Sequence, residues 1–380
     1  MSAASSHTNR VALFSLDRSL LGDGVGDGVR RHRRYAQSCA SLDIIVLAPR
    51  GFRPVQLSAS CAVYPTGAAH IFGHAWAAMK IFRSLVARYR IDLVVTQDLL
   101  SPVALLLARR YRIPLLISVH GVWWDQWFLR KRFWHRFLTC LIFYALRRAA
   151  AIRVVSDTVK HALIARGVRR AAIHVISTPV EIQRFYRPAS SSSEPSPERL
   201  PHVLSVGRLE REKRLDHLLQ AWKKVIARVP HARLFIVGDG SQRHALTALT
   251  QTLALTESVF FAGAVPTEEI PSYYHNAAVF ALTSESESFG KVLVEAGAAQ
   301  LPAVATATLG AQSIIQPDVT GFLVPVGDTN LIAEKIIQLL TDHLLASTMG
   351  TAARAHIASS YDWEKNIQKV VRLWKQTIQR

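Results

Sequence analysis

Residues 278–296 read AVFALTSESESFGKVLVEA, and this stretch combines a strand, a loop and the start of a helix. The apolar run from Ala278 to Leu282 predicts a short buried strand. The serines and glutamates after it predict a loop, and Ser288-Phe289-Gly290 precedes an apolar pattern at helical spacing. A strand, a loop and a helix in this order indicate a parallel sheet.

The same alternation continues on both sides of this stretch. Short apolar strands followed by helical patterns are typical of parallel sheets whose two faces are covered by helices. The elements predicted before residue 187 are Val11–Leu16, Val29–Ala40, Ile44–Leu47, Leu93–Thr96, Val103–Arg110, Leu115–Val119, Ile152–Val155 and Thr158–Arg166. Those predicted after residue 201 are His202–Val206, Leu215–Arg228, Arg233–Val237, a helix after Gly240, Val259–Phe261, Ala278–Leu282, a helix after Phe289, Ala303–Ala305 and Gly321–Val324.

A change of composition divides these two series of elements. The segment 187–201, RPASSSSEPSPERLP, contains four consecutive serines and four prolines and has too few apolar residues to form a core. We predict an N-terminal domain over 1–187, a linker over 188–201, a C-terminal domain over 202–361 and a helix over 362–380 that packs back on the first domain. The fold class is α/β with two doubly wound Rossmann-like domains, whose ligands bind at the carboxyl ends of the strands.

The net charge of +19 is confined to the first half of the chain. Residues 1–190 hold 28 Lys and Arg against 9 Asp and Glu, whereas residues 191–380 hold 18 of each. Such asymmetry predicts attraction to a polyanion, either a phospholipid surface or nucleic acid. The polar start MSAASSHTNR and the absence of a long apolar run predict a cytoplasmic protein. Three cysteines without metal-ligand spacing indicate neither a disulfide framework nor a zinc site.

Two glutamates of the opening stretch are separated by seven residues. Glu287 and Glu295 have this spacing, whereas the position eight beyond Glu285 is Leu293. In this motif the sequence resembles the family 4 retaining glycosyltransferases, the glycosyl transferases group 1. The resemblance implies a GT-B fold, in which two Rossmann-like domains face each other across a cleft. It also implies transfer of a sugar from a nucleoside diphosphate with retention at the anomeric carbon.

The start of the helix after this loop is suited to an anion. The first backbone N–H groups of a helix have no partner within the helix and attract phosphate, so Ser288, Phe289 and Gly290 are expected to bind the donor diphosphate. The resemblance implies that Glu287 binds sugar hydroxyls and that Glu295 binds the ribose. The alternative is an exposed acidic loop followed by a glutamate on a helix surface.

A second motif follows the first strand of the C-terminal domain. Gly207-Arg208-Leu209 with Lys213 five residues beyond the arginine is similar to a family pattern in which the two cations stabilise the leaving diphosphate. The chain has no Asp-x-Asp motif, so we expect neither a metal ion nor another cofactor. The family often has glycine after the lysine, where this chain has Arg214. The alternative is that both cations are solvated charges near a helix start.

Two positions of the first domain are candidates for the opposite side of the active site. Gly24, in the glycine-rich loop 22–28, is expected to approach the donor phosphates, with a flexible loop as the alternative. His120 follows a predicted strand, and the resemblance implies that it contacts the sugar or the acceptor. The alternative is a histidine at the strand end whose hydrogen bonds are satisfied within the domain and which has no role in the reaction. Thr96-Gln97-Asp98 ends the preceding predicted strand and could contact the acceptor, but for this stretch and for the turn Gly238-Asp239-Gly240 a purely structural role is favoured.

The segment 121–137, GVWWDQWFLRKRFWHRF, combines four tryptophans and three phenylalanines with basic residues. Tryptophan prefers the membrane interface and cations are drawn to anionic lipids. We expect an anionic membrane surface to be contacted by Trp123, Trp124, Trp127, Arg130, Lys131 and Arg132. The alternative is that these aromatic residues pack inside the domain.

These observations predict a hexosyltransferase that uses a UDP- or GDP-sugar and acts on a glycan or polyprenyl-linked acceptor at the inner face of the cell membrane. The catalytic residues are expected to be His120, Arg208, Lys213 and Glu287. One alternative is a soluble glycosyltransferase with a small-molecule acceptor. A basic nucleic-acid-binding protein is the alternative of another class, but it leaves the glutamate motif without a role, so no specific nucleic acid is expected.

Overall fold

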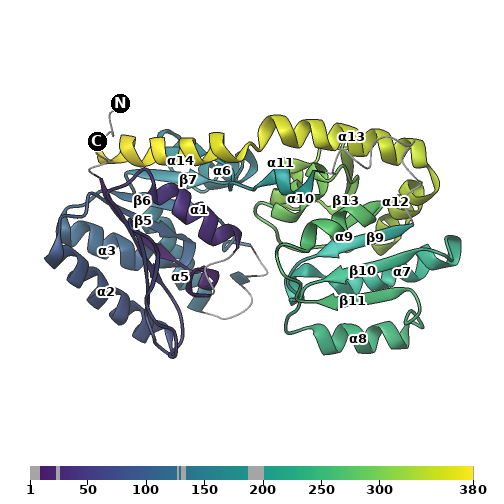
Figure 1. Cartoon of the computed structure of the whole chain (residues 1–380), viewed down its shortest axis with the longest axis horizontal. Coiled ribbons are helices and arrows are strands. Elements are labelled where there is room, and N and C mark those ends of the chain that lie inside the picture. The colour runs from purple at the N-terminus through teal and green to yellow at the C-terminus, as the bar shows by residue number, and fades with distance from the viewer. Residues whose placement is uncertain (1–8, 23–25, 126–127, 130–133, 187–200, 380) are drawn as a thin grey trace. The chain divides into compact units, whose positions relative to one another are not determined.

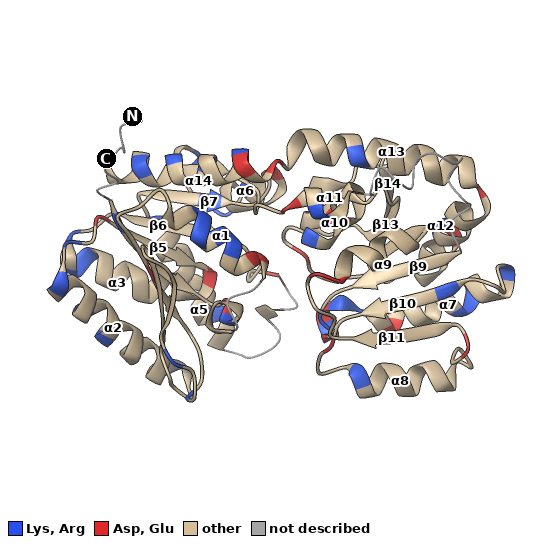
Figure 2. Ribbon diagram, viewed as in Figure 1, with Lys and Arg blue, Asp and Glu red and all other residues tan. Residues whose placement is uncertain are grey.

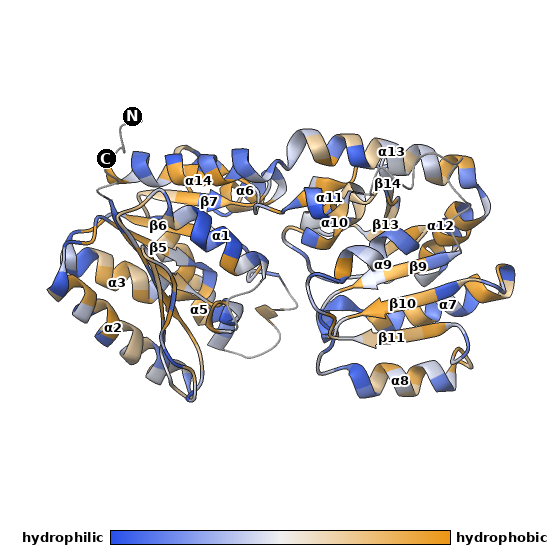
Figure 3. Cartoon of the chain, in the orientation of Figure 1, coloured by the Kyte–Doolittle hydropathy of each residue, from blue (hydrophilic) through white to orange (hydrophobic). Residues whose placement is uncertain are grey.

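The computed structural model describes the chain except for residues 1–8, 23–25, 126–127, 130–133, 187–200 and 380. The chain divides into two compact units (Figure 1). The first comprises Met1–Pro179 with Glu364–Arg380, and the second comprises Val180–Trp363. Each unit has its own sheet covered by helices, and the apolar residues concentrate on the strands (Figure 3).

The sheet of the first unit has the strand order β3-β4-β2-β1-β5-β6-β7-β8. Every neighbouring pair is parallel except β3 and β4, which are antiparallel. The order reverses at β1, which lies between β2 and β5. The strands are β1 Arg10–Ser15, β2 Ser41–Val46, β3 Val55–Ser58, β4 Cys61–Pro65, β5 Leu93–Gln97, β6 Leu115–Val119, β7 Ala151–Val154 and β8 Ile173–Val175.

The directions of the strand connections determine on which face of the sheet each helix of the first unit lies. Because parallel crossovers are right-handed, α1 lies on one face of the sheet and α3 and α5 lie on the other. The α-helices are α1 Asp27–Ala36, α2 Ile71–Arg88, α3 Ser101–Tyr111, α5 Trp134–Leu146, α6 Asp157–Ile164 and α14 Trp363–Ile378. Short 3-10 helices are η1 Arg18–Leu21, η2 Asp98–Leu100 and η3 Arg170–Ala172.

The second unit has a parallel sheet with the order β11-β10-β9-β12-β13-β14. Its strands are β9 His202–Val206, β10 Arg233–Val237, β11 Val259–Gly263, β12 Val279–Leu282, β13 Ala303–Thr306 and β14 Gly321–Val324. Its helices are η4 Ile182–Phe185, η6 Arg211–Lys213, α7 Leu215–Arg228, α8 Arg243–Thr252, α9 Ile270–Asn276, α10 Lys291–Ala298, α11 Leu309–Ile314, α12 Thr329–Thr341 and α13 His343–Ser360. The core includes Trp222 of α7, which is fully buried and donates its indole N–H to the hydroxyl of Ser258 at 3.1 Å. Both units are therefore α/β domains of the doubly wound kind.

Several elements of the first unit are absent from the sequence prediction, among them α5 and β8. The hairpin of β3 and β4 and the long helix α2 were assigned to no element, because their apolar positions are interrupted by polar and small residues. β3 is an edge strand with the exposed Gln56, which explains its weak apolar pattern.

No helix in the described part of the chain is long and apolar enough to cross a bilayer.

The boundary between the units lies after Pro179, earlier than the end of the first domain predicted at residue 187. η4 belongs to the second unit because its residues bind α9 and the loop before it. The ring of Phe185 lies edge-on to that of Tyr274 with 5.3 Å between centroids, and the carbonyl of Phe185 lies 3.0 Å from Nε2 of His275. Arg184 donates to the carbonyl of Thr267 at 2.7 Å.

The C-terminal helix α14 belongs to the first unit. Arg34 of α1 forms an ion pair with Glu364 at 2.6 Å, and the ring centroids of Tyr35 and Trp374 are 5.2 Å apart. The amide of Asn366 donates to the hydroxyl of Ser177 at 2.9 Å. Helix α14 therefore packs on the unit from which it is most distant in sequence.

Candidate active site

Two motif loops of the second unit begin at the point where its strand order reverses. β9 lies between β10 and β12, so the connections from β9 and β12 leave toward opposite sides of the sheet. Such a point opens a crevice at the carboxyl ends of the strands, where doubly wound proteins bind ligands. The loop after β9 carries Arg208 and Lys213, and the loop after β12 carries Glu287. The topology therefore places both motifs at one edge of the sheet.

Lys213 and Glu287 are in direct contact. The ammonium of Lys213 lies 2.7 Å from Oε2 of Glu287, and the two side chains are 19% and 17% exposed. Each partner neutralises the other while both keep access to solvent. An incoming diphosphate can pair with the same ammonium, and sugar hydroxyls can donate to the same carboxylate.

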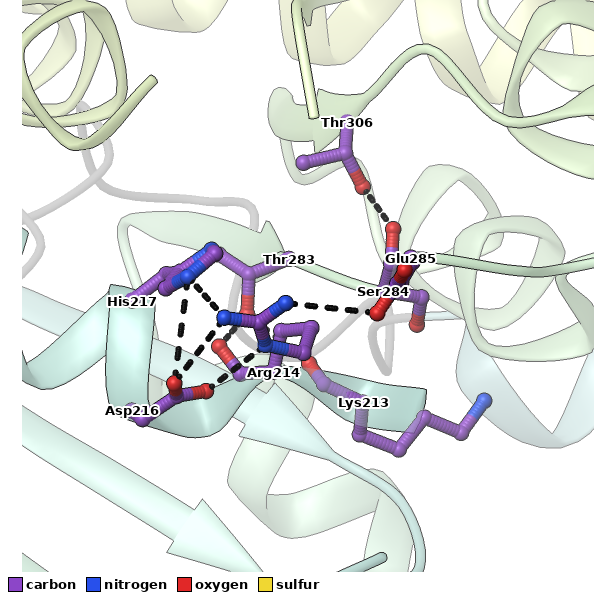
Figure 4. A network of polar contacts seen from close by, with 8 residues as sticks. All are labelled: Lys213, Arg214, Asp216, His217, Thr283, Ser284, Glu285 and Thr306. Atoms are coloured by element: carbon purple, nitrogen blue, oxygen red, sulfur yellow. Dashed lines mark hydrogen bonds and ion pairs between the residues drawn. The ribbon is translucent and has the colours of Figure 1, made fainter. Parts of the chain in front are cut away.

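A network of polar contacts joins the two loops behind this pair (Figure 4). The hydroxyl of Thr283 lies 3.1 Å from the carbonyl of Lys213 and 3.0 Å from that of Arg214. The backbone N–H of Glu285 donates to the carbonyl of Glu212 at 2.8 Å. The hydroxyl of Thr306 in β13 donates to the carbonyl of Ser284 at 2.6 Å. Hydrogen bonds to three successive residues of the first loop thus hold Lys213 beside the second loop.

Arg214 has a left-handed backbone with φ of 46°. Residues other than glycine adopt this backbone conformation at a cost of about 1 kcal/mol or more. This cost gives a physical reason why the family often has glycine at this position. In this chain the guanidinium of Arg214 pairs with Asp216 at 3.1 Å and with Glu285 at 3.2 Å. The ion pairs offset the backbone cost and add a further link between the loops. The sequence showed this residue only as a departure from the family pattern.

Arg208 extends toward solvent, with 72% of its side chain exposed, and pairs with Glu212 at 3.1 Å. Its backbone is held by the glycine turn after β10. The N–H of Leu209 donates to the carbonyl of Asp239 at 2.9 Å, and a Cβ on Gly238 would lie 1.9 Å from the carbonyl oxygen of Gly207. The turn Gly238-Asp239-Gly240 therefore supports the site through close backbone packing.

The loop before α10 is fixed by contact with α11. Phe289 is buried, and Gly290 has φ of 80° at the helix start. The N–H of Gly310 donates to the carbonyl of Glu287 at 2.7 Å, and a Cβ on Gly310 would lie 2.7 Å from the nitrogen of Phe289. Gly310 was not among the predicted site residues. Its signal in the sequence is weak, because its role depends on a contact between two helix starts.

Glu295 lies more than one turn inside α10 and is 5% exposed. One oxygen of its carboxylate accepts from the hydroxyl of Tyr274 at 2.8 Å, and the other lies 3.0 Å from the ammonium of Lys291. Burial and the charge of Glu295 raise the pKa of Tyr274 well above its usual value, so this hydroxyl remains a donor. A carboxylate has about four acceptor positions, so lone pairs remain for a ribose hydroxyl.

In the first unit, Asp98 organises the turn that carries His120. Oδ1 of Asp98 accepts from the N–H of His120 at 2.9 Å, from the N–H of Gly121 at 3.1 Å and from the indole of Trp123 at 3.2 Å. Burial raises the pKa of Asp98 to about 6, although these hydrogen bonds oppose the shift. Its backbone has a positive φ of 32°, as expected of a residue held by its surroundings. The structural interpretation of Asp98 agrees with these contacts.

His120 is half-buried in a basic environment. Its pKa lies well below the usual value because of burial and because of the nearby Arg153, Arg31 and His32. Arg153 is itself buried and donates to the carbonyls of Ile176 at 3.0 Å and Ser177 at 2.9 Å. The imidazole of His120 is therefore neutral at pH 7, and a neutral imidazole can both donate and accept hydrogen bonds.

The structure corrects the prediction for Trp123 and Trp124. Both are buried, with 3% and 6% exposure, and their rings pack against each other at 4.7 Å and against Phe143 of α5. They belong to the core of the first unit, so they cannot contact a membrane surface. The local sequence did not distinguish the two cases because aromatic residues serve both. Gly24, Trp127, Arg130, Lys131 and Arg132 lie outside the described residues.

Comparison with known families decides the assignment of the chain. The family described as Glycosyl transferases group 1 matches residues 187–356, and the one described as Glycosyltransferase Family 4 matches residues 23–184. The chain belongs to the family 4 glycosyltransferases. The family that the sequence motif of Glu287 and Glu295 predicted is thereby confirmed for this glycosyltransferase.

Curated relatives and solved structures agree with this membership. The chain is 32% identical to N-acetyl-alpha-D-glucosaminyl L-malate synthase of Bacillus anthracis, over 44% of this chain and 43% of the relative. It is 30% identical to sulfoquinovosyl transferase SQD2 of Arabidopsis thaliana, over 76% of this chain and 57% of the relative. The matches thus span about half the length of these relatives.

Solved structures show the fold of this glycosyltransferase. Sucrose-phosphate synthase from Thermosynechococcus elongatus has a TM-score of 0.84 at 24% identity and covers 97% of this chain and 98% of that one. Anabaena Alr3699/HepE in complex with UDP and glucose has a TM-score of 0.77 at 19% identity and covers 97% and 100%. The predicted GT-B fold is confirmed.

Proposed function

We propose that the chain transfers a hexose from a nucleoside diphosphate sugar to an acceptor hydroxyl, with retention at the anomeric carbon. The observation that carries this proposal is the contact of Lys213 with Glu287 at the switch point of the second sheet. A cation for the diphosphate and a carboxylate for the sugar lie side by side there, next to the start of α10.

Each residue has a separate task in this reaction. Lys213 and Arg208 stabilise the negative charge that develops on the leaving diphosphate, together with the backbone N–H groups at the start of α10. Glu287 orients the sugar through its hydroxyls, and Glu295 accepts from the ribose. The two cations supply the charge that a divalent metal provides in other transferases, so we propose that the reaction needs no metal ion.

The retaining outcome follows from attack on the face that the diphosphate leaves. In such a step an oxygen of the leaving phosphate takes the proton of the acceptor hydroxyl as the new glycosidic bond forms. Neutral His120 is proposed to hydrogen-bond the acceptor or the sugar. Its low pKa keeps the ring uncharged throughout the physiological range.

We propose further that the acceptor is a lipid-linked or cell-envelope glycan intermediate at the inner face of the membrane. The excess positive charge of the first half of the chain supports this location. Among the relatives is a GDP-mannose-dependent phosphatidylinositol monomannoside mannosyltransferase of Mycobacterium tuberculosis, whose name includes a lipid acceptor.

The donor can be identified by thermal shift. UDP, GDP, UDP-glucose, UDP-N-acetylglucosamine and GDP-mannose are screened with and without EDTA, since a ligand that binds the native state raises its melting temperature. We expect one nucleotide class to raise Tm, and its sugar conjugate to be consumed with release of the diphosphate at the same rate in EDTA. The anomeric coupling constant of the product, measured by NMR, tests retention. Absence of any shift with all five ligands would contradict the proposed donor site.

A further inference from the structure

Three helices of the first unit form a surface that the proposed transfer reaction does not use. α3 contacts α2 and also α5, so the three helices are neighbours on one face of the sheet. We define the α2–α3–α5 face by its six exposed large apolar side chains. They are Phe72 and Trp76 of α2, Leu106 of α3, and Phe137, Leu141 and Tyr144 of α5.

The exposure of these side chains is unusual. Phe72 is 84% exposed, Phe137 is 67% and Trp76 is 64%. Within the described part of the chain, twelve large apolar side chains are exposed, and six of them lie on these three helices. Single exposed apolar side chains are common on soluble proteins and need no explanation. A cluster of them is uncommon and indicates an interaction surface.

The apolar positions recur along one side of each helix. Phe72 and Trp76 are four residues apart, and Lys80 and Arg83 continue the same exposed side of α2. On α5, Phe137, Leu141 and Tyr144 follow the same helical spacing. Each of these two helices therefore presents an amphipathic surface outward in addition to the apolar side that packs on the sheet.

The charge of this face has a single sign. The ranges 71–88, 101–111 and 134–146 contain no Asp or Glu. Figure 2 shows Lys and Arg but no acidic residue on α2 and α3. Several cations adjoin the aromatic rings: Lys80 lies over Trp76 at 5.6 Å, and Arg109 and Arg148 lie over Tyr144 at 5.8 and 4.9 Å. The exposed cations of the three helices and their ends include Lys80, Arg83, Arg88, Arg109, Arg110, Arg112, Arg136, Arg147 and Arg148.

We infer that the α2–α3–α5 face binds an anionic lipid bilayer. Phe72, Leu106 and Phe137 insert among the acyl chains, and Trp76 and Tyr144 lie at the headgroup level where amphipathic rings are favoured. The surrounding cations pair with lipid phosphates. This assignment gives the proposed membrane location a specific surface, and it replaces Trp123 and Trp124, which are buried.

Two other occupants fit the face less well. Nucleic acid would pair with the cations but would leave the side chains of Leu106 and Leu141 in water, since phosphates offer them no apolar contact. A second copy packed through the same face would bring cations against cations, because a two-fold interface matches a surface with itself. A bilayer alone supplies both an apolar layer and a negative surface.

Vesicle flotation tests the inference. Vesicles of phosphatidylcholine and phosphatidylglycerol in equal amounts are compared with vesicles of phosphatidylcholine alone, for the full chain and for the variant Phe72→Ser/Trp76→Ser/Phe137→Ser. The matched control is Phe260→Ser/Val319→Ser/Leu344→Ser, which removes three exposed apolar side chains of the second unit. All six positions are exposed, so both variants are expected to fold, which circular dichroism checks.

We expect the full chain and the control to bind the anionic vesicles, and the α2–α3–α5 variant to bind at least tenfold more weakly. Lys80→Gln/Arg83→Gln should weaken binding and reduce its salt dependence. Equal binding by the α2–α3–α5 variant and the control would overturn the inference. So would an absence of vesicle binding, or a wild-type dimer in solution that the three serines dissociate.

The outcome is separable from that of the proposed function. Lys213→Ala should bind vesicles as the wild type does, because the residue lies in the other unit. The α2–α3–α5 variant should retain the nucleotide-induced rise in Tm. Loss of vesicle binding in Lys213→Ala would show that the binding surface is not the one assigned here.

Discussion

The ammonium of Lys213 lies 2.7 Å from a carboxylate oxygen of Glu287, although 74 positions separate the two residues in the chain. The contact joins the loop after β9 to the loop after β12, and Thr283 and Arg214 hold those loops together from behind. In the proposed reaction the pair receives the diphosphate and the sugar of one donor molecule. The donor therefore has to enter between charges that already neutralise each other.

We predict that Lys213→Ala and Glu287→Ala each lower kcat by about 10²- to 10³-fold, as loss of one group that stabilises developing charge does in other enzymes. The double variant should lose less than the product of the two effects, because each single change leaves its partner without a counter-ion. Steady-state release of the nucleoside diphosphate measures these values. Lys223→Ala, an exposed lysine of α7, is the control and should retain full activity. Near wild-type rates in both single variants would contradict the site assignment.

The left-handed backbone of Arg214 predicts that glycine at this position is more stabilising than alanine. Arg214→Ala keeps the left-handed backbone with φ of 46° and loses the ion pairs to Asp216 and Glu285. Arg214→Gly loses the same pairs but relieves the backbone cost, so it should be more stable than the alanine variant by about 1 kcal/mol. Urea-induced unfolding followed by circular dichroism compares the two. An alanine variant as stable as the glycine variant would exclude a left-handed residue at this position.

Gly310 should tolerate no side chain. A Cβ at this position would lie 2.7 Å from the nitrogen and 2.8 Å from the carbonyl carbon of Phe289, so the loop before α10 would have to move. We expect Gly310→Ala to weaken nucleotide binding about tenfold or more, since small displacements of a binding loop are costly. Calorimetric titration measures the affinity. Thr247→Ala is the control, because Thr247 is an exposed residue of α8 that lies in neither the proposed donor site nor its supporting loops.

The pKa of Asp98 predicts how stability depends on pH. Its value of about 6 in the folded state exceeds the ordinary 3.8, so the folded state holds this proton more tightly than the unfolded state. The stability that this carboxyl contributes is complete below pH 3.8 and is lost as the pH rises through 6. The side chain of Asp98→Asn can accept the same hydrogen bonds but does not titrate. The stability of the variant relative to wild type should therefore increase by about 2 kcal/mol between pH 4 and pH 7.

Urea unfolding at several pH values tests this difference. Comparing the variant with the wild type cancels other groups, among them His32, whose pKa is lowered to about 4 by burial and Arg31. A difference that does not change with pH would mean that Asp98 titrates near its ordinary pKa. A difference that decreases with pH would mean that the three donors outweigh the burial of the carboxyl.

Much of the fold was accessible from local patterns. The alternation of short apolar strands with helical stretches predicted two doubly wound domains, and both sheets have this form. The hairpin of β3 and β4 and the helix α2 were not predicted, because an edge strand and an exposed amphipathic helix have few buried residues. The contacts of η4 with α9 likewise place the boundary between the units after Pro179, whereas the composition of the linker predicted it at residue 187.

The sequence by itself determined the family and the register of the glutamate motif, because both depend on the order and spacing of residues within one loop and helix. Only the tertiary structure decided which distant residues meet. It placed Lys213 against Glu287, made Asp98 the acceptor that holds the His120 turn, and buried Trp123 and Trp124 while exposing Phe72 and Phe137. The physical reason is that an aromatic side chain can be stabilised by a protein core or by a membrane interface, and a charged side chain by an ion pair or by solvent. The choice depends on what the folded chain brings next to it.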